Sequence, residues 1–214
     1  ALALLGCRVR RAVILDRDGP IARAQFVINQ RPMLRHITLL PRGPFWLRPL
    51  SPQARQHALS LLYASTYALG TKVHITNAAT PIDDILLRES GHMRIATPQT
   101  MAVLDLTLAQ DARLAAQTIK WRNRLRHAQN NNLDIERSTF APTKHYWLLK
   151  TEAAQRKTNR YRALPPTFTL AFASATPSAT QLFIARHKGQ CVAAMQFLMH
   201  GTMATYHIGW SAAL

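Results

Sequence analysis

The stretch His36–Gln53, HITLLPRGPFWLRPLSPQ, contains the sharpest structural signals in this chain. An apolar run from Ile37 to Leu40 ends on Pro41-Arg42-Gly43-Pro44, and Ser51-Pro52 follows. Serine is a favoured helix N-cap, and proline is tolerated at the first helical position. This order predicts a strand, a tight turn and a helix.

The turn at Pro41–Pro44 also suits a binding role. The prolines fix φ and Gly43 permits close approach of the backbone, so Arg42 is presented rigidly at the end of a strand. Its guanidinium is a planar fork that matches carboxylate or phosphate. We therefore predict that Arg42 and Gly43 bind substrate. The alternative is a structural turn in which Arg42 lies in solvent or pairs with Asp83 or Asp84.

Composition indicates a globular, strongly basic protein. The chain has 214 residues, 48% of them hydrophobic, and its 27 Lys and Arg against 10 Asp and Glu give a net charge of +17. This charge predicts affinity for nucleic acid, anionic lipid head groups or nucleotide-linked substrates, unless it reflects general basicity alone. No apolar run approaches the roughly 20 residues of a membrane span. The two cysteines and the absence of zinc-site spacing favour a reducing, cytoplasmic setting without a metal.

Strand and helix patterns alternate along the chain. In the first half we predict strands at residues 12–15 and 21–28 joined as a hairpin, a strand over Leu34–Leu40, a helix from Ser51 to Gly70, a strand at 72–76 and a helix at 82–88. In the second half we predict a strand over Thr100–Leu108, a helix over Ala109–Gln129, a strand at 133–136, a helix at 142–161, a break at Pro165-Pro166, and strands at 180–185, 190–199 and 203–210.

The two halves repeat a pattern 171 positions apart. At this spacing the chain is identical at the pairs Ala22/Ala193, Gln25/Gln196, Phe26/Phe197, His36/His207 and Ile37/Ile208. Such an internal match predicts that both halves are built on one α/β plan. The second copy stops soon after Trp210, so we expect it to be incomplete.

Three ordered motifs resemble those of the FemAB-type aminoacyltransferases, which carry two tandem acetyltransferase-like (GNAT) units. They are ITLLPRGPFW in the first half, VLDLTL followed by KWRNRLRHAQNNNLDI over residues 103–135, and YWLLKTEAAQRKTNRYRALP over residues 146–165. The acyl-CoA loop of ordinary GNAT enzymes, an Arg or Gln followed by x-x-Gly-x-Gly or Ala, is absent from the sequence.

The resemblance implies an α/β (α+β) fold of two tandem GNAT-like units, with mixed or antiparallel sheets flanked by helices. We place the first unit at residues 1–96 and the second, incomplete unit at 97–214. The implied activity is transfer of an acyl or aminoacyl group to an amine without a bound cofactor. The donor would be aminoacyl-tRNA or acyl-CoA, and the acceptor would be a peptidoglycan precursor or similar amine. The resemblance is also compatible with a protein that contacts a membrane surface. A non-catalytic, basic nucleic-acid-binding module is the alternative.

Five further residues are predicted to bind an anionic substrate. Lys120, Arg122 and Arg126 lie on a basic helix that suits phosphates, although a solvated basic face has the same pattern. Arg156 belongs to the third motif, and Tyr206 alternates with His207 so that one of the two faces any cleft. We interpret His36 and His207 as satisfied core histidines. The catalytic residues are unknown, and direct attack by the substrate amine needs no protein nucleophile.

Overall fold

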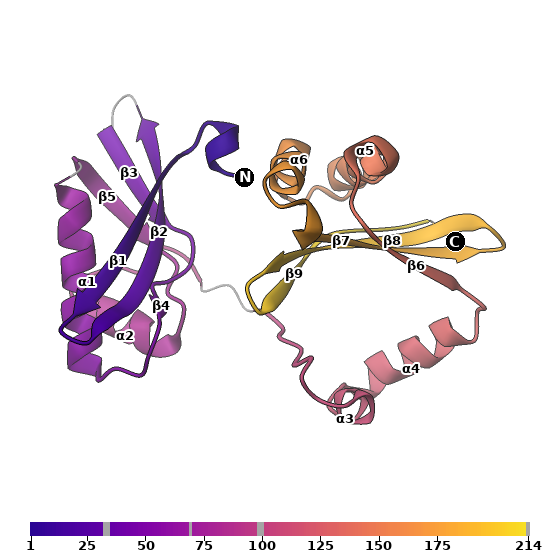
Figure 1. The fold of residues 1–214 in the computed structure, drawn as a ribbon, viewed down its shortest axis with the longest axis horizontal. Coiled ribbons are helices and arrows are strands. Elements are labelled where there is room, and N and C mark those ends of the chain that lie inside the picture. The colour runs from indigo at the N-terminus through magenta and orange to yellow at the C-terminus, as the bar shows by residue number, and fades with distance from the viewer. Residues whose placement is uncertain (32–34, 69, 98–100, 213–214) are drawn as a thin grey trace. The chain divides into compact units, whose positions relative to one another are not determined.

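The computed structural model describes residues 1–31, 35–68, 70–97 and 101–212 and divides into two compact units, Leu2–Thr100 and Met101–Leu214 (Figure 1). This division lies close to residue 96, where the sequence placed the end of the first unit. Each unit holds one sheet with helices beside it, so the predicted fold class, with mixed and antiparallel sheets flanked by helices, is confirmed.

The first unit is a mixed sheet with two helices. After a short 3₁₀ turn at Ala3–Leu5, its elements are β1 (Arg8–Asp16), β2 (Gly19–Arg31), β3 (Arg35–Leu40), β4 (Phe45–Trp46), α1 (Pro52–Tyr67), β5 (Thr71–Thr76) and α2 (Pro81–Glu89). The strand order is β1-β2-β3-β5, and β4 pairs with β2. Only β5 runs parallel to its neighbour β3, because α1 forms the crossover between them.

Both helices of the first unit begin as their sequences predict. The Ser51 side chain accepts a hydrogen bond from the Ala54 amide at 3.2 Å, with Pro52 following at the first helical position. Thr80 caps α2 in the same way through the Asp83 amide. These caps satisfy backbone donors that a helix start leaves without partners.

The core of the first unit lies between the sheet and α1. Alternate residues of β2, including Ala22 and Phe26, face α1 and pack with Leu40, Ala58 and Leu62. The intervening residues Arg23 and Gln25 are exposed. This alternation leaves the opposite face of β1 and β2 open for polar side chains.

The second unit is an antiparallel sheet of order β6-β7-β8-β9. Its elements are α3 (Gln110–Ala115), α4 (Ile119–Gln129), β6 (Asp134–Thr139), α5 (Pro142–Asn159), α6 (Pro166–Ala175), a 3₁₀ turn at Pro177–Ala179, β7 (Thr180–His187), β8 (Gln190–His200) and β9 (Met203–Ser211). Figure 1 shows α5 and α6 over one face of this sheet and α3 and α4 on its other side. Leu148 and Leu149 of α5 pack on Leu182, Ile184 and other inward residues of the sheet.

The strand pairing supports the repeat for the first hairpin of each unit. Ile14 pairs with Ala22 and Ala185 with Ala193, and a β-bulge follows Ile14 and Ala185 alike. Both the register and the bulge therefore recur 171 positions later. The equivalence of His36 and His207 is wrong, because His36 pairs with Gln30 whereas His207 is the extra residue of a bulge in β9.

Two predictions in the second unit are wrong. Of the strand predicted over Thr100–Leu108, Thr100 lies outside the described residues and 101–108 form no strand. The Asp105 side chain accepts from the amide and hydroxyl of Thr107 at 2.9 and 2.7 Å, a local turn that competes with extended backbone. Leu34, the predicted start of the third strand, also lies outside the described residues.

The single helix predicted over 109–129 is two helices, α3 and α4, separated by an extended Thr118. Neither helix buries a residue, so no tertiary packing favours one continuous helix across Thr118. The sequence predicts only a break at Pro165-Pro166. In the structure Pro166 is the first residue of α6, a position that proline suits.

Candidate functional site

The Pro41–Pro44 turn is anchored to the segment that follows β5. The Gly43 amide donates to the Asn77 carbonyl at 3.3 Å, and the Asn77 amide donates to the Leu40 carbonyl at 3.0 Å. Gly43 has φ 131°, and an added Cβ would meet the Phe45 amide nitrogen at 3.4 Å and Leu40 Cδ1 at 3.7 Å. Gly43 is buried and Arg42 is exposed, so the glycine shapes the turn and the arginine is left available.

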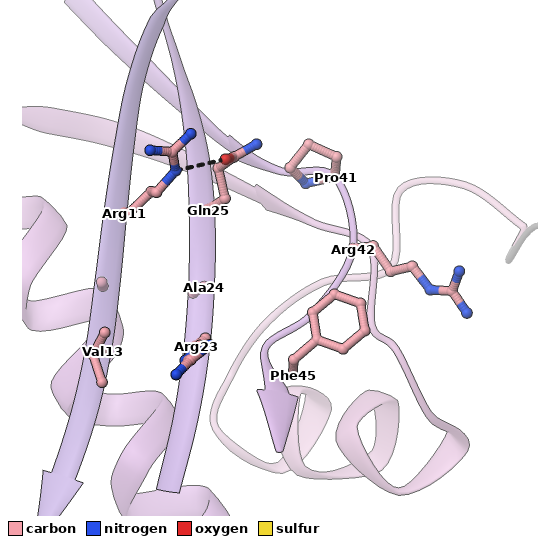
Figure 2. A pocket seen from close by; sticks show the side chains of 9 residues that line it. Arg11, Val13, Arg23, Ala24, Gln25, Pro41, Arg42 and Phe45 are labelled. Atoms are coloured by element: carbon pink, nitrogen blue, oxygen red, sulfur yellow. Dashed lines mark hydrogen bonds between the residues drawn. The ribbon is translucent and has the colours of Figure 1, made fainter. Parts of the chain in front are cut away.

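A hollow of about 370 Å³ lies beside this turn, on the open face of the first sheet. Figure 2 shows its side chains. They come from β1, β2, the turn and β4, and they are Arg11, Ala12, Val13, Arg23, Ala24, Gln25, Pro41, Arg42 and Phe45. The strand register pairs Arg11 with Gln25, Val13 with Arg23, and Arg23 with Phe45, which places these side chains on one face.

Three arginines surround the hollow without a carboxylate among its lining residues. Arg11 Nε donates to Gln25 Oε1 at 3.1 Å, which fixes one guanidinium at the rim. In the described part of the chain, neither Arg23 nor Arg42 has a side-chain hydrogen bond or ion pair. In Figure 2 the Arg42 guanidinium extends away from the strands, so it must swing inward to share a ligand with Arg11.

The alternative partners of Arg42 are occupied by other groups. Asp83 is fully buried. Its carboxylate accepts a hydrogen bond from Trp46 Nε1 at 3.0 Å and forms an ion pair with Arg55 at 3.3 Å. Asp84 pairs with Arg88 and Arg94. Arg42 is therefore free to meet an external anion, and the apolar surface of Phe45 and Val13 would contact whatever part of that ligand is uncharged.

The other predicted site residues lie in the second unit and are not gathered at one place. Lys120, Arg122 and Arg126 lie along α4, where Lys120 and Arg126 are exposed and Arg122 is half-buried. Arg156 of α5 donates to the carbonyls of Leu164 at 3.2 Å and Ala163 at 3.5 Å, which ties down the chain before α6. Tyr206 is on β9 next to Phe197 of β8. Their roles in binding stay predictions.

The histidine and cysteine side chains of the second unit have structural partners. His207 Nε2 lies 2.7 Å from the Thr169 hydroxyl, and burial lowers the pKa of His207, as befits a satisfied core histidine. Burial raises the pKa of the Cys191 thiol, with Arg186 opposing this, so the thiol stays protonated at neutral pH. In the described residues no group of three or more His, Cys, Asp or Glu is arranged to hold a metal ion.

Sequence reasoning missed Arg11, Arg23, Gln25 and Phe45. The first predicted strand began at residue 12, although the structure extends it to Arg8, so the pairing of Arg11 with Gln25 could not be read. The signal was present in the alternation of β2, where Arg23 and Gln25 lie between the apolar residues Ala22, Ala24 and Phe26. Phe45 gave no signal, because a two-residue strand has no periodicity.

Comparison of the whole structure with solved structures matches both units. FemX superimposes with a TM-score of 0.72 at 10% identity, over 99% of this chain and 73% of the FemX chain. The chain has the fold of FemX. A second match is the C-terminal DUF2156 domain assigned to a lysylphosphatidylglycerol synthetase of Agrobacterium fabrum, with a TM-score of 0.54 at 13% identity, over 94% of this chain and 61% of that domain.

The similarity to FemX is one of fold. No profile of a known protein family matches the sequence, and no characterised protein matches it at the level of sequence. The resemblance to FemAB-type proteins predicts a fold of two tandem units, and the structural match confirms this fold. Among the described residues, no helix has the length and apolar character needed to cross a membrane.

Proposed function

We propose that this protein is a transferase that moves an aminoacyl or acyl group onto an amine acceptor, as FemAB-type aminoacyltransferases do. The observation that carries the proposal is the FemX fold, which extends over 99% of the chain and so includes both units. A fold alone hosts many activities, so the argument also needs a site with suitable chemistry. The arginine-lined hollow in the first unit supplies one.

The hollow is suited to hold the acceptor by an anionic group. Three arginines line a space of about 370 Å³, and together they match a phosphate or carboxylate once Arg42 swings inward, while Phe45 and Val13 offer apolar contact beside it. A peptidoglycan precursor is an acceptor of this chemistry, since it joins an anionic portion to a free amine. Binding energy from the anion would then orient the amine for reaction.

The reaction is direct attack by that amine on the acyl carbonyl carbon of the donor. The new C–N bond forms as the bond to the ester oxygen or thioester sulfur breaks, and the amine's proton passes to the leaving group. The protonated thiol of Cys191 does not compete as a nucleophile, and no bound cofactor is required. We favour aminoacyl-tRNA as donor over acyl-CoA, because the chain carries a net charge of +17 that suits a polyanion.

Parallel incubations with different donors test this function. The protein is mixed with an amine-bearing peptidoglycan precursor and either tRNA charged with a labelled amino acid or labelled acetyl-CoA. We expect label in the acceptor with charged tRNA. Label transferred only from acetyl-CoA would establish the CoA-dependent alternative. Failure with every donor, together with tight binding of tRNA, would favour a non-catalytic nucleic-acid-binding protein.

A further inference from the structure

A row of aromatic side chains crosses the second sheet on the face away from α5 and α6. It consists of Phe183 on β7, Phe197 on β8 and Tyr206 on β9, one ring from each neighbouring strand. The ring centroids are 5.8 Å apart between Phe183 and Phe197 and 6.0 Å apart between Phe197 and Tyr206. We call these three residues the aromatic row.

The aromatic row lies on an open surface. The neighbouring positions Leu182, Ile184 and Gln196 are buried on the inward side, so the row points outward by strand alternation. Tyr206 is 55% exposed, Phe183 and Phe197 are half-buried, and Met195, which pairs with Phe183, is 51% exposed. Apolar surface that stays uncovered adds no stability to the fold, which makes this surface a candidate binding face.

The bulge in β9 and Gly209 hold Tyr206 in this row. At the bulge His207 turns inward to Thr169, whereas Tyr206 stays opposite Phe197. A Cβ on Gly209 would overlap the phenol ring of Tyr206, so only glycine at this position lets the ring lie flat along the strand.

Positive charge accompanies the aromatic row. The Arg137 guanidinium carbon lies 5.8 Å from the Phe183 ring centroid, and Arg137 Nε donates to Gln181 Oε1 at 3.1 Å. Strands β7, β8 and β9 contain no Asp or Glu. Glu136 of β6 pairs with Lys144 of α5 on the helix-covered side.

Helix α4 adds to this charge. Figure 1 shows it on the side of the sheet away from α5 and α6, which is the side to which strand alternation directs the aromatic row. It carries Lys120, Arg122, Arg124 and Arg126 without an acidic residue. Arg124 lies over the Trp121 ring at 5.3 Å, so this helix also presents an exposed aromatic beside a guanidinium.

We propose that the aromatic row, with Arg137 and α4, binds unpaired RNA nucleotides by stacking their bases while the arginines contact the phosphates. Aromatic side chains on the open face of a sheet, flanked by basic residues, form a kind of surface that recognises single-stranded nucleic acid, because every base offers a ring face. The proposal rests on the proposed function in one respect: the unpaired RNA is the 3′ end of the aminoacyl-tRNA donor.

Fluorescence anisotropy with a labelled, uncharged eight-nucleotide RNA tests the aromatic row. We expect Phe183→Leu and Phe197→Leu each to weaken binding about tenfold, because leucine keeps the apolar volume but cannot stack. Phe172→Leu on α6, which covers the other face of the sheet, is the matched control and should bind within twofold of the unchanged protein. Urea unfolding of each variant verifies that the fold is retained.

The charge is tested with Arg137→Gln, compared with Lys150→Gln on α5 at the helix-covered side. We expect Arg137→Gln alone to weaken binding and to reduce the slope of log affinity against log salt by about one. Three results would overturn the proposal: no binding of the oligonucleotide, equal binding by the Phe→Leu variants, or binding to phosphatidylglycerol vesicles in place of RNA.

The oligonucleotide carries no amino acid, so its binding is independent of transfer activity. RNA binding that depends on the aromatic row while every transfer assay fails would uphold this proposal and reject the proposed function. If the Phe→Leu variants transfer from charged tRNA at an unchanged rate and KM, the proposed function is upheld and the role of the aromatic row is rejected.

Discussion

At the scale of single residues, Arg11, Arg23 and Arg42 differ in how they are held. Arg11 is fixed by Gln25, whereas Arg23 and Arg42 have no partner in the described part of the chain. A bound anion therefore gains its strongest new contacts from Arg23 and Arg42. These guanidiniums give up only hydrogen bonds to water when they bind the anion, whereas Arg11 already donates to Gln25.

Arg23→Gln should raise the KM for the anionic acceptor about tenfold and leave kcat nearly unchanged, since it removes a contact made equally before and during reaction. Steady-state kinetics with varied acceptor measure this. The matched control is Arg17→Gln in the β1–β2 turn, away from the lining of the hollow. Equal effects of the two substitutions would show that general charge, not the hollow, binds the acceptor.

At the scale of secondary structure elements, Asp83 ties three elements of the first unit together. Its carboxylate accepts from Thr80 Oγ1 at 2.7 Å, from Trp46 of β4 and from Arg55 of α1. The Arg55 guanidinium also lies 5.2 Å from the Trp46 ring centroid. This cluster fixes β4, and β4 presents Phe45 to the hollow.

Asp83→Ala should lower the free energy of unfolding by about 3–5 kcal/mol, because it leaves a largely buried arginine without its partner. Urea denaturation followed by tryptophan fluorescence reports the loss. Asp84→Ala, whose partners Arg88 and Arg94 are exposed, should cost about 0–1 kcal/mol. A similar, small loss for both variants would contradict a supporting role for Asp83.

The elements that could be predicted from the sequence are those with local signals. Ser51-Pro52 fixed the start of α1, and the hairpin turns at Gly19 and Gly189 fixed two pairs of strands. Residues 101–108 and the break at Thr118 could not be predicted, because an apolar run there has no buried partner. The sequence also could not predict that Arg11, Arg23 and Arg42 line one hollow. The strand register and the course of the chain after β3 bring these residues together.

At the scale of the whole molecule, histidines that are buried or half-buried in both units make stability depend on pH. Burial lowers the pKa of His74, with a contribution from His92, and burial also lowers the pKa of His145 and His207. His145 Nδ1 accepts the Ala141 amide at 2.9 Å, so its protonation would break a bond at the start of α5.

The unfolded chain therefore binds more protons than the native chain below the ordinary histidine pKa of 6.5. Stability is fully present above this value and falls as the pH decreases through the lowered native values. We expect the urea midpoint to decrease between pH 7.5 and pH 5, and less so in His145→Asn. A midpoint that rises on acidification would contradict the assignment.

The most direct measurement of the central claim is the mass of the acceptor after incubation with charged tRNA. Transfer predicts a gain of one aminoacyl residue in a product that survives hydroxylamine, because an amide forms where the donor had an ester. The yield at low acceptor concentration should fall in Arg23→Gln and Arg42→Gln but not in Arg17→Gln. An unchanged acceptor mass with aminoacyl-tRNA and with acyl-CoA alike would contradict the claim that this FemX fold is a transferase.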